Sequence, residues 1–332
     1  MREEIQALSA RLGADPMLVQ GAGGNISWKE DGRLWVKASG ARMQDALVRD
    51  IFVPVNLKQA RDPLAPARVD PIWNRVASLR PSIETSLHAL MPQRVVAHLH
   101  SVDFMSRLVR RSCRELLNDL LRDRRHALVP YHKPGTDLAA SVHQLVREQP
   151  NADVLLLTNH GIVVAANSAE ELDLRLTELV SSLANNIRPI ARAALTAQSA
   201  APHGYRRPAD PAVDDLALDA VTFDFAQKCW AITPDHVVFL GASSNALTDR
   251  PERASIGAPL EFFIVRGDGV FIRDDDAHRA NMIEEMLRCY RDVAVRIDDL
   301  SDVALLKDHE VMDLLGWEAE QYRQKLNGVV GR

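Results

Sequence analysis

The chain has few cysteines, no long apolar run and no excess of basic residues, and each absence excludes a class of protein. Its 332 residues include three cysteines, which are too few and too scattered for a disulfide framework, so we expect a reducing compartment. No uninterrupted apolar run approaches the length of a membrane span. The formal net charge of -5 gives no electrostatic reason to bind nucleic acid or an anionic membrane surface.

The first residues lack the features of a targeting signal. Residues 1–12 have the pattern of an amphipathic helix rather than of a signal peptide, so we expect a soluble cytoplasmic protein. A chain of this length buries about three-quarters of the surface that it exposes when unfolded, which fits one large domain or two smaller ones.

Residues 1–195 alternate short strand patterns with helix patterns, which is typical of an α/β domain. A turn at residues 30–32 leads into an apolar strand pattern at 34–36, so we expect a hairpin there. The β-branched, apolar runs at 153–157 and 162–166 are typical of buried strands.

A composition rich in Ala, Ser, Pro, His and Arg predicts a linker over residues 196–210. Residues 211–332 then have the pattern of a smaller α/β lobe. Its expected elements are a helix over 214–227, a strand over 236–240, a hairpin of 262–265 and 270–272, and helices over 277–295 and 303–327.

Residues 95–100 have the pattern of a strand that carries two histidines, His98 and His100. Side chains at positions i and i+2 of a strand share one face, so two imidazoles would lie side by side. His160 follows a buried strand where the chain turns at Gly161; on its own it would be an ordinary loop histidine. Three neutral imidazoles with one open position are the usual ligands of a catalytic divalent metal, most often zinc.

Two turns of small residues flank the predicted hairpin. Residues 21–27 form a glycine-rich loop whose backbone amides could approach an anion closely, and residues 38–41 form a second small-residue turn. The first is not a dinucleotide fingerprint, because a hairpin rather than a helix follows it. The two turns are compatible with a phosphate clasp and equally with ordinary turn chemistry.

Glu84 opens a helix pattern in which Ser82 is the expected cap. A glutamate in the first turn is most often only a residue that favours the helix start. His98 and His100 follow one helix and one turn later, so their strand can return beside it. A carboxylate near a metal is either a ligand or a general base.

Together, six ordered segments over roughly residues 10 to 190 resemble those of the class II aldolase/adducin family. They are GAGGNIS at 21–27, ASG at 38–40, PSIE at 81–84, HLH at 98–100, Tyr131 with PGT at 134–136, and NHG at 159–161. The amino-acid sequence at 34–40 and 81–85 is most similar to the aldolase half of fused rhamnulose-phosphate aldolase/short-chain dehydrogenases. Ala38 departs from the pattern, since many members carry a hydroxyl residue or proline there.

The resemblance implies a three-layer α/β/α fold around a mainly antiparallel sheet, with a smaller C-terminal α/β lobe and a homo-oligomer, usually a tetramer. It also implies roles for particular residues: His98, His100 and His160 as ligands of Zn²⁺ or another divalent metal, Glu84 as the acid/base, and Gly24, Asn25, Ser39 and Gly40 as the holders of the substrate phosphate.

The implied reaction is retro-aldol cleavage of a ketose or sugar phosphate, in which the metal stabilises an enediolate. No lysine Schiff base is needed, so Lys37 and Lys133 have no assigned role. For a further acid from the C-terminal region, Tyr290 and Tyr322 are the candidates.

Three other functions fit the same residues in part. An epimerase, dehydratase or decarboxylase would use the same site with a different outcome. A non-catalytic, adducin-like interaction module would have no need of the full set of histidines and glutamate. A structural metal site is disfavoured, because it is normally closed by four protein ligands and no cysteine lies near these motifs.

Overall fold

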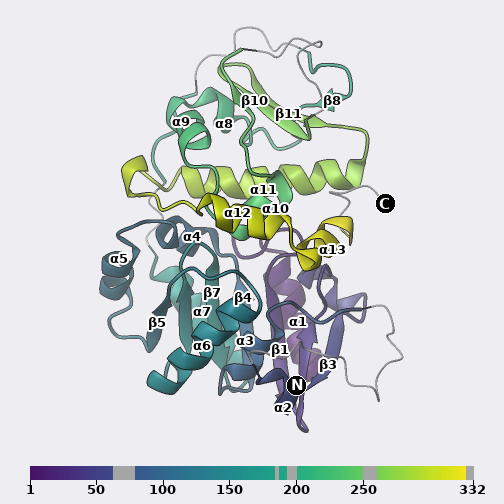
Figure 1. Ribbon diagram of the computed structural model, residues 1–332, viewed down its shortest axis with the longest axis vertical. Coiled ribbons are helices and arrows are strands. Elements are labelled where there is room, and N and C mark those ends of the chain that lie inside the picture. Colours follow the sequence, from purple (N-terminus) through teal and green to yellow (C-terminus); the bar gives the residue numbers. More distant parts are fainter. Residues whose placement is uncertain (63–78, 184–186, 193–199, 250–259, 327–332) are drawn as a thin grey trace. The chain divides into compact units, whose positions relative to one another are not determined.

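The computed structural model describes residues 1–62, 79–183, 187–192, 200–249 and 260–326 (Figure 1). Contacts within the chain divide it into two compact units, Met1–Ala184 and Asn185–Arg332. Among the described residues, none of the helices combines the length and the apolar character needed to cross a lipid bilayer.

The first unit is built on a seven-stranded sheet with the strand order β3-β2-β1-β4-β7-β6-β5. Every neighbouring pair is antiparallel except β5 and β6. The strands are β1 (Asn25–Glu30), β2 (Arg33–Lys37), β3 (Phe52–Asn56), β4 (Val95–Leu99), β5 (His126–Val129), β6 (Val154–Leu157) and β7 (Gly161–Ala166).

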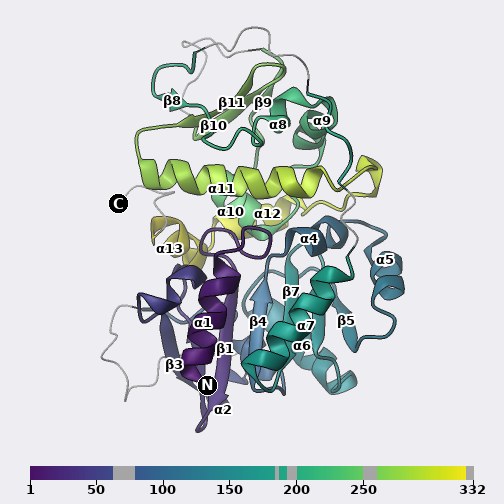
Figure 2. The ribbon, with the colours of Figure 1, turned by 180° about the vertical axis from the view of Figure 1, so that it is seen from behind.

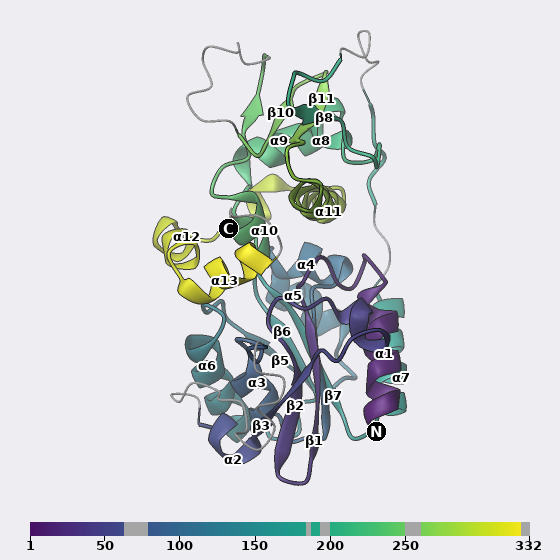
Figure 3. The same cartoon turned by 90° about the vertical axis from the view of Figure 1, so that its right-hand side faces the viewer.

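Helices cover both faces of this sheet. Helices α1 (Arg2–Gly13) and α7 (Ala169–Ser181) lie side by side on one face (Figure 2). Helices α2 (Leu57–Ala60), α3 (Thr85–Leu90) and α6 (Thr136–Glu148) lie on the other, so the edge-on view shows three layers (Figure 3). The other α-helices that the structure describes in this unit are α4 (Val102–Leu108) and α5 (Cys113–Leu120). The predicted three-layer α/β/α fold with a mainly antiparallel sheet is confirmed.

The alternation of residues along β1 decides what each face of the sheet meets. Ile26 and Trp28 belong to the apolar core that includes α1 and α7. The alternate residues Asn25, Ser27 and Lys29 are polar, and all three are buried. Because side chains alternate across a strand, these three share the opposite face, which α3 covers.

The second unit contains a four-stranded sheet with the order β8-β11-β10-β9. Its strands are β8 (Tyr205–Arg206), β9 (Ala246–Leu247), β10 (Phe262–Val265) and β11 (Gly269–Arg273), and the predicted hairpin is β10–β11. Its helices are α8 (Asp215–Leu218), α9 (Ala220–Lys228), α10 (Pro234–Leu240), α11 (Ala277–Ala294), α12 (Asp308–Leu315) and α13 (Glu318–Leu326).

The strand predicted over 236–240 is wrong, because this segment is helix α10. A short apolar run has no periodicity that separates a strand from a buried helix. The residues before the run decide the outcome: Thr233 caps the helix by accepting a hydrogen bond from the backbone N–H of His236, and Pro234 occupies the first turn.

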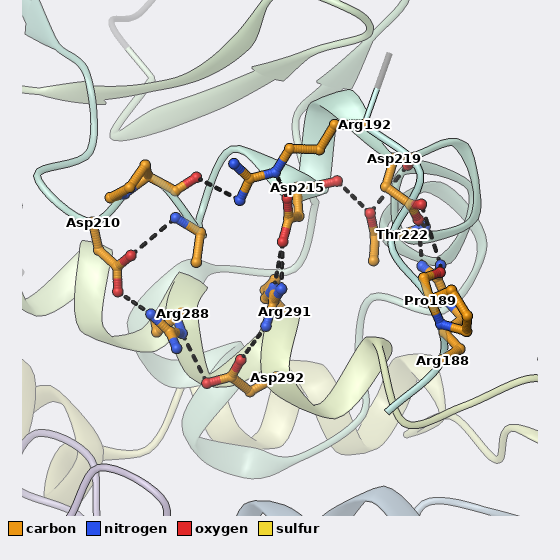
Figure 4. Close-up of polar contacts among 12 residues, drawn as sticks. Arg188, Pro189, Arg192, Asp210, Asp215, Asp219, Thr222, Arg288, Arg291 and Asp292 are labelled. Carbon is orange, nitrogen blue, oxygen red and sulfur yellow. Dashed lines mark hydrogen bonds and ion pairs between the residues drawn. The ribbon is translucent and has the colours of Figure 1, made fainter. Parts of the chain in front are cut away.

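The boundary between the units lies before the predicted linker, since residues 188–192 are bound within the second unit. Arg188 pairs with Asp219, and Arg192 pairs with Asp215 (Figure 4). The described part of the predicted linker, residues 200–210, includes strand β8. Charged side chains of residues 188–192 and strand β8 of residues 200–210 therefore bind this polar segment to the second sheet and its helices.

Asp215 is the most buried carboxylate of this network. It has no exposed surface and accepts hydrogen bonds from both Arg192 and Arg291, with 2.9 Å between Arg291 Nε and the carboxylate (Figure 4). A buried carboxylate is tolerated only when it is paired in this way, so the network fixes the start of α8 against α11.

Candidate metal centre

Three histidines meet at one end of strand β4. His98 lies within the strand, His100 directly follows it, and the turn between β6 and β7 brings His160 beside them. One ring nitrogen of each lies within 4.8 Å of the others, and all three side chains are buried. The Nε2 atoms of His98 and His100 are 3.0 Å apart. The structure therefore brings together the three histidines that the sequence singled out.

The β6–β7 turn depends on a glycine and on one unusual backbone conformation. Asn159 has a φ of 52°, which lets the chain reverse before His160. A Cβ atom at Gly161 would collide with the carbonyl oxygen of Leu99 and would lie 3.2–3.3 Å from the rings of His98 and His100. Only glycine lets β7 approach the histidine pair this closely.

Hydrogen bonds outside the cluster orient the rings. Nδ1 of His98 lies 3.0 Å from the carbonyl oxygen of Ile162, to which it can only donate. The neutral His98 ring then carries its lone pair on Nε2, the nitrogen that faces the other histidines. The Gln20 side chain donates to the backbone carbonyl of His100 and fixes the chain where it leaves β4.

Glu84 places its carboxylate against this cluster. Its Oε2 is 3.4 Å from Nε2 of His98, and its Oε1 is 3.6 Å from Nε2 of His160. The Asn25 side chain donates to Oε2 at 2.8 Å. Glu84 is the N-cap residue of α3 rather than part of its first turn, and Ser82 Oγ accepts a hydrogen bond from its backbone N–H.

The donor set fits a divalent metal ion. Three imidazoles with one open position are the usual protein ligands of zinc in a catalytic site, and a carboxylate beside them is a ligand type that divalent metals also accept. Oε1 of Glu84 and Oδ1 of Asn25 are buried and accept no hydrogen bond from any described residue. Buried oxygens in that condition are costly unless a cation, a water molecule or a substrate satisfies them.

The charge state of Glu84 follows from its surroundings. Burial by itself raises the pKa of the carboxyl group, but His98, His160 and the Asn25 amide outweigh burial and lower the pKa to about 2. The carboxylate is therefore ionised at neutral pH, and this is the form that accepts a proton.

The four residues expected to hold a phosphate lie on two turns. Gly24 has a φ of 58°, and a Cβ atom there would lie 3.0 Å from the carbonyl oxygen of His98. Asn25 pairs with His98 across β1 and β4 and contacts Glu84. The first turn therefore borders the histidine cluster.

The second turn holds Ser39 and Gly40. The backbone N–H of Ser39 donates to the carbonyl oxygen of Arg80 at 2.8 Å, and Gly40 has a φ of 76°. The Lys37 ammonium links the two turns, because it donates to the carbonyl oxygens of Ala22 and Ala41 at 3.1 and 2.6 Å. Lys37 had no role assigned from the sequence, although a lysine that ends the apolar run Leu34–Val36 and is itself buried is the signal that finds it.

A protein-family model, the class II aldolase and adducin N-terminal domain, matches residues 3–186, which are more than half of the chain. The chain belongs to the class II aldolase and adducin family. The uncharacterized oxidoreductase YuxG of Bacillus subtilis (strain 168) is 29% identical over 187 residues, which cover 51% of this chain and 27% of that protein. The chain thus matches about a quarter of a longer oxidoreductase, in agreement with the resemblance to fused proteins.

Solved structures of aldolases and aldolase domains are similar to part of this chain. The N-terminal class II aldolase domain of a conserved protein from Thermoplasma acidophilum is 26% identical, with a TM-score of 0.46, and the match covers 56% of this chain and 92% of that one. The L-fuculose-1-phosphate aldolase of Thermus thermophilus is 18% identical, with a TM-score of 0.38, over 55% and 93% of the two chains.

Tyr290 does not meet the requirements of a catalytic acid. Its side chain is completely buried in the second unit, and its hydroxyl donates to the carbonyl oxygen of Cys229 at 2.8 Å. Burial raises the pKa of this phenol well above its usual value. Tyr322 lies on α13 and stays a candidate.

Proposed function

We propose that the chain is a divalent-metal-dependent lyase that cleaves a ketose or sugar phosphate by a retro-aldol reaction. The observation that carries this proposal is the buried cluster of three histidine nitrogens within 4.8 Å of one another, with a carboxylate 3.4 Å from the nearest of them. We take zinc as the metal, and a homo-oligomer, with a tetramer favoured, as the assembly.

Retro-aldol cleavage breaks the bond between the carbon next to the ketone and the following carbon, which carries a hydroxyl group. The hydroxyl proton leaves as the new carbonyl forms, and the electron pair of the broken bond stays on the other fragment, where a proton must be added. A metal ion held by His98, His100 and His160 supplies Lewis-acid stabilisation of the negative charge on the substrate oxygens. Glu84, ionised and largely shielded from water, takes a proton in one direction and returns it in the other.

In this proposal the two turns recognise the phosphate group. Gly24 and Gly40 would approach the phosphate oxygens through their backbone amides, and Asn25 and Ser39 through their short side chains. The Lys37 ammonium, held between the turns, supports the assignment because it adds a positive charge beside them and keeps them together.

The test is product formation from a panel of ketose phosphates and the matching free ketoses. We expect two carbonyl products from a phosphorylated substrate, loss of turnover after chelation and recovery with added zinc. Glu84→Gln should keep the metal and lose turnover, since an amide cannot accept the proton. A fully active Glu84→Gln protein would refute the acid/base role.

Product analysis also separates the other outcomes at this site. An isomeric sugar phosphate as product would indicate an epimerase, loss of water a dehydratase, and release of carbon dioxide a decarboxylase. Absence of both metal binding and turnover would favour a non-catalytic interaction module.

A further inference from the structure

Strand β1 and helix α3 are joined by three polar contacts that follow one another along both elements. Asn25 donates to Glu84, Ser27 Oγ lies 2.8 Å from Nδ1 of His88, and the Lys29 ammonium donates to carbonyl oxygens just after the helix. Those last acceptors are the carbonyl oxygens of Met91 and Gln93. We call these three contacts the polar ladder.

The spacing of the first two contacts matches the geometry of the two elements. Glu84 and His88 are four residues apart, which is about 6 Å along an α-helix. Asn25 and Ser27 are two residues apart, which is about 6.7 Å along a strand. Because the two repeats nearly coincide, the helix can lie along the strand with both contacts formed, and a shift by one residue would break both.

Apart from the polar ladder, the residues of the sheet that pack against α3 are apolar. Ser27 is paired with Val36 on β2 and with Val96 on β4, so it is the one hydroxyl in this row. Leu87 packs in the same cluster as Val96, and Ala89 packs in the same cluster as Val36. Contacts between apolar side chains are not directional. These residues therefore fix the distance of α3 from the sheet better than they fix the position of α3 along β1.

Burying the polar groups of the polar ladder costs free energy of folding that burying apolar groups would not cost. Ser27 and His88 have no exposed surface, and Lys29 is 8% exposed. Burial, with a smaller contribution from Arg61, lowers the pKa of Lys29 to about 7. A buried polar pair can often be replaced by an apolar pair without loss of stability. The polar pair, however, fixes one relative position of the two elements that it joins.

We propose that Ser27, His88 and Lys29 are positioning residues, which hold the six-residue helix α3 in the register that sets the Glu84 carboxylate beside His98 and His160. An isolated helix of this length has no stability of its own, so its register comes from its contacts. This inference rests on the proposed function only for the role of Glu84; the positioning itself is a statement about structure.

The decisive variant is the double substitution Ser27→Ala/His88→Leu, which replaces the middle contact with an apolar pair of similar size. It is compared with the wild-type protein, with Glu84→Gln, and with Ser9→Ala as control. Ser9 is an equally buried serine on α1, and its hydroxyl donates to the carbonyl oxygen of Met43 on the other side of the sheet.

The readouts are thermal unfolding, the visible absorption of the cobalt(II)-loaded protein, a crystal structure, and kcat and KM for an accepted substrate. For the double variant we expect unfolding near the wild-type temperature and one cobalt per chain. Its absorption bands should move toward those of Glu84→Gln, and its Glu84 carboxylate should lie farther than 3.4 Å from Nε2 of His98. We expect kcat to fall about 10- to 100-fold with KM unchanged. Ser9→Ala should leave the spectrum and kcat unaltered.

A double variant with the wild-type spectrum and an unmoved Glu84 would overturn the proposal. If it fails to fold, Ser27→Ala and Lys29→Met are judged by the same criteria. If the wild-type protein cleaves no ketose phosphate, the proposed function fails, and the spectrum and crystal structure still decide the positioning. If the wild-type protein binds no cobalt, the crystal structure decides alone.

Discussion

His88 should make the metal-free protein sensitive to mild acid. Burial, only partly opposed by attraction to Glu84, lowers the pKa of His88 from 6.5 to about 3. The folded chain keeps this imidazole neutral, whereas the unfolded chain protonates it below pH 6.5. The unfolded state therefore binds more protons between pH 6.5 and 3, and stability falls as the pH falls through this window. The slope approaches about 1.4 kcal/mol per pH unit, which gives about 2 kcal/mol at pH 5.

The assay is urea unfolding at pH 7 and pH 5 with a chelator present, for the wild-type protein and for Ser27→Ala/His88→Leu. Trp28 and Trp35 stack in the first unit and report its unfolding by fluorescence. We expect the wild-type protein to lose about 2 kcal/mol more than the double variant between the two pH values. An equal loss in both proteins would show that His88 is not held neutral by burial, and would refute the reasoning.

Three further changes test other parts of the structure. Gly161→Ala should lower metal affinity and destabilise the first unit by about 1–3 kcal/mol, because the new methyl group collides with the Leu99 carbonyl; metal titration and thermal unfolding measure this. Asp215→Asn should destabilise the second unit by about 3–5 kcal/mol, because two guanidinium groups lose their buried charge partner, whereas Asp119→Asn at an exposed ion pair should change unfolding little. Asn25→Ala should raise KM for a phosphorylated substrate; an unchanged KM would remove this residue from the phosphate site.

The sequence predicted the histidine cluster because its signals are local. His98 and His100 share a strand face by their spacing alone, and Gly161 marks the turn that carries His160. Glu84 was singled out because His98 and His100 follow it after one helix and one turn, so their strand can return beside it. Position along one strand determined only that His98 and His100 meet; the placement of His160 and Glu84 beside them was implied by the family resemblance.

Two features that the sequence did not predict depend on partners far along the chain, and a third depends on a local cap. The alternation of Asn25, Ser27 and Lys29 is visible in the sequence, but only the structure shows that α3 lies over that face. Segment 236–240 was predicted as a strand because the cap at Thr233 was overlooked. The structure divides the two units before the predicted linker, and the pairing of Arg188 with a distant aspartate has no local signal in the sequence.

The most direct test of the metal centre is the metal content of the purified protein, measured by elemental mass spectrometry beside His98→Ala. The account predicts close to one divalent ion per chain in the wild-type protein, with zinc expected, and its loss in the variant, because two ligands cannot hold a catalytic metal as three do. A wild-type protein that holds no metal after reconstitution, or a variant that keeps its metal, would contradict it.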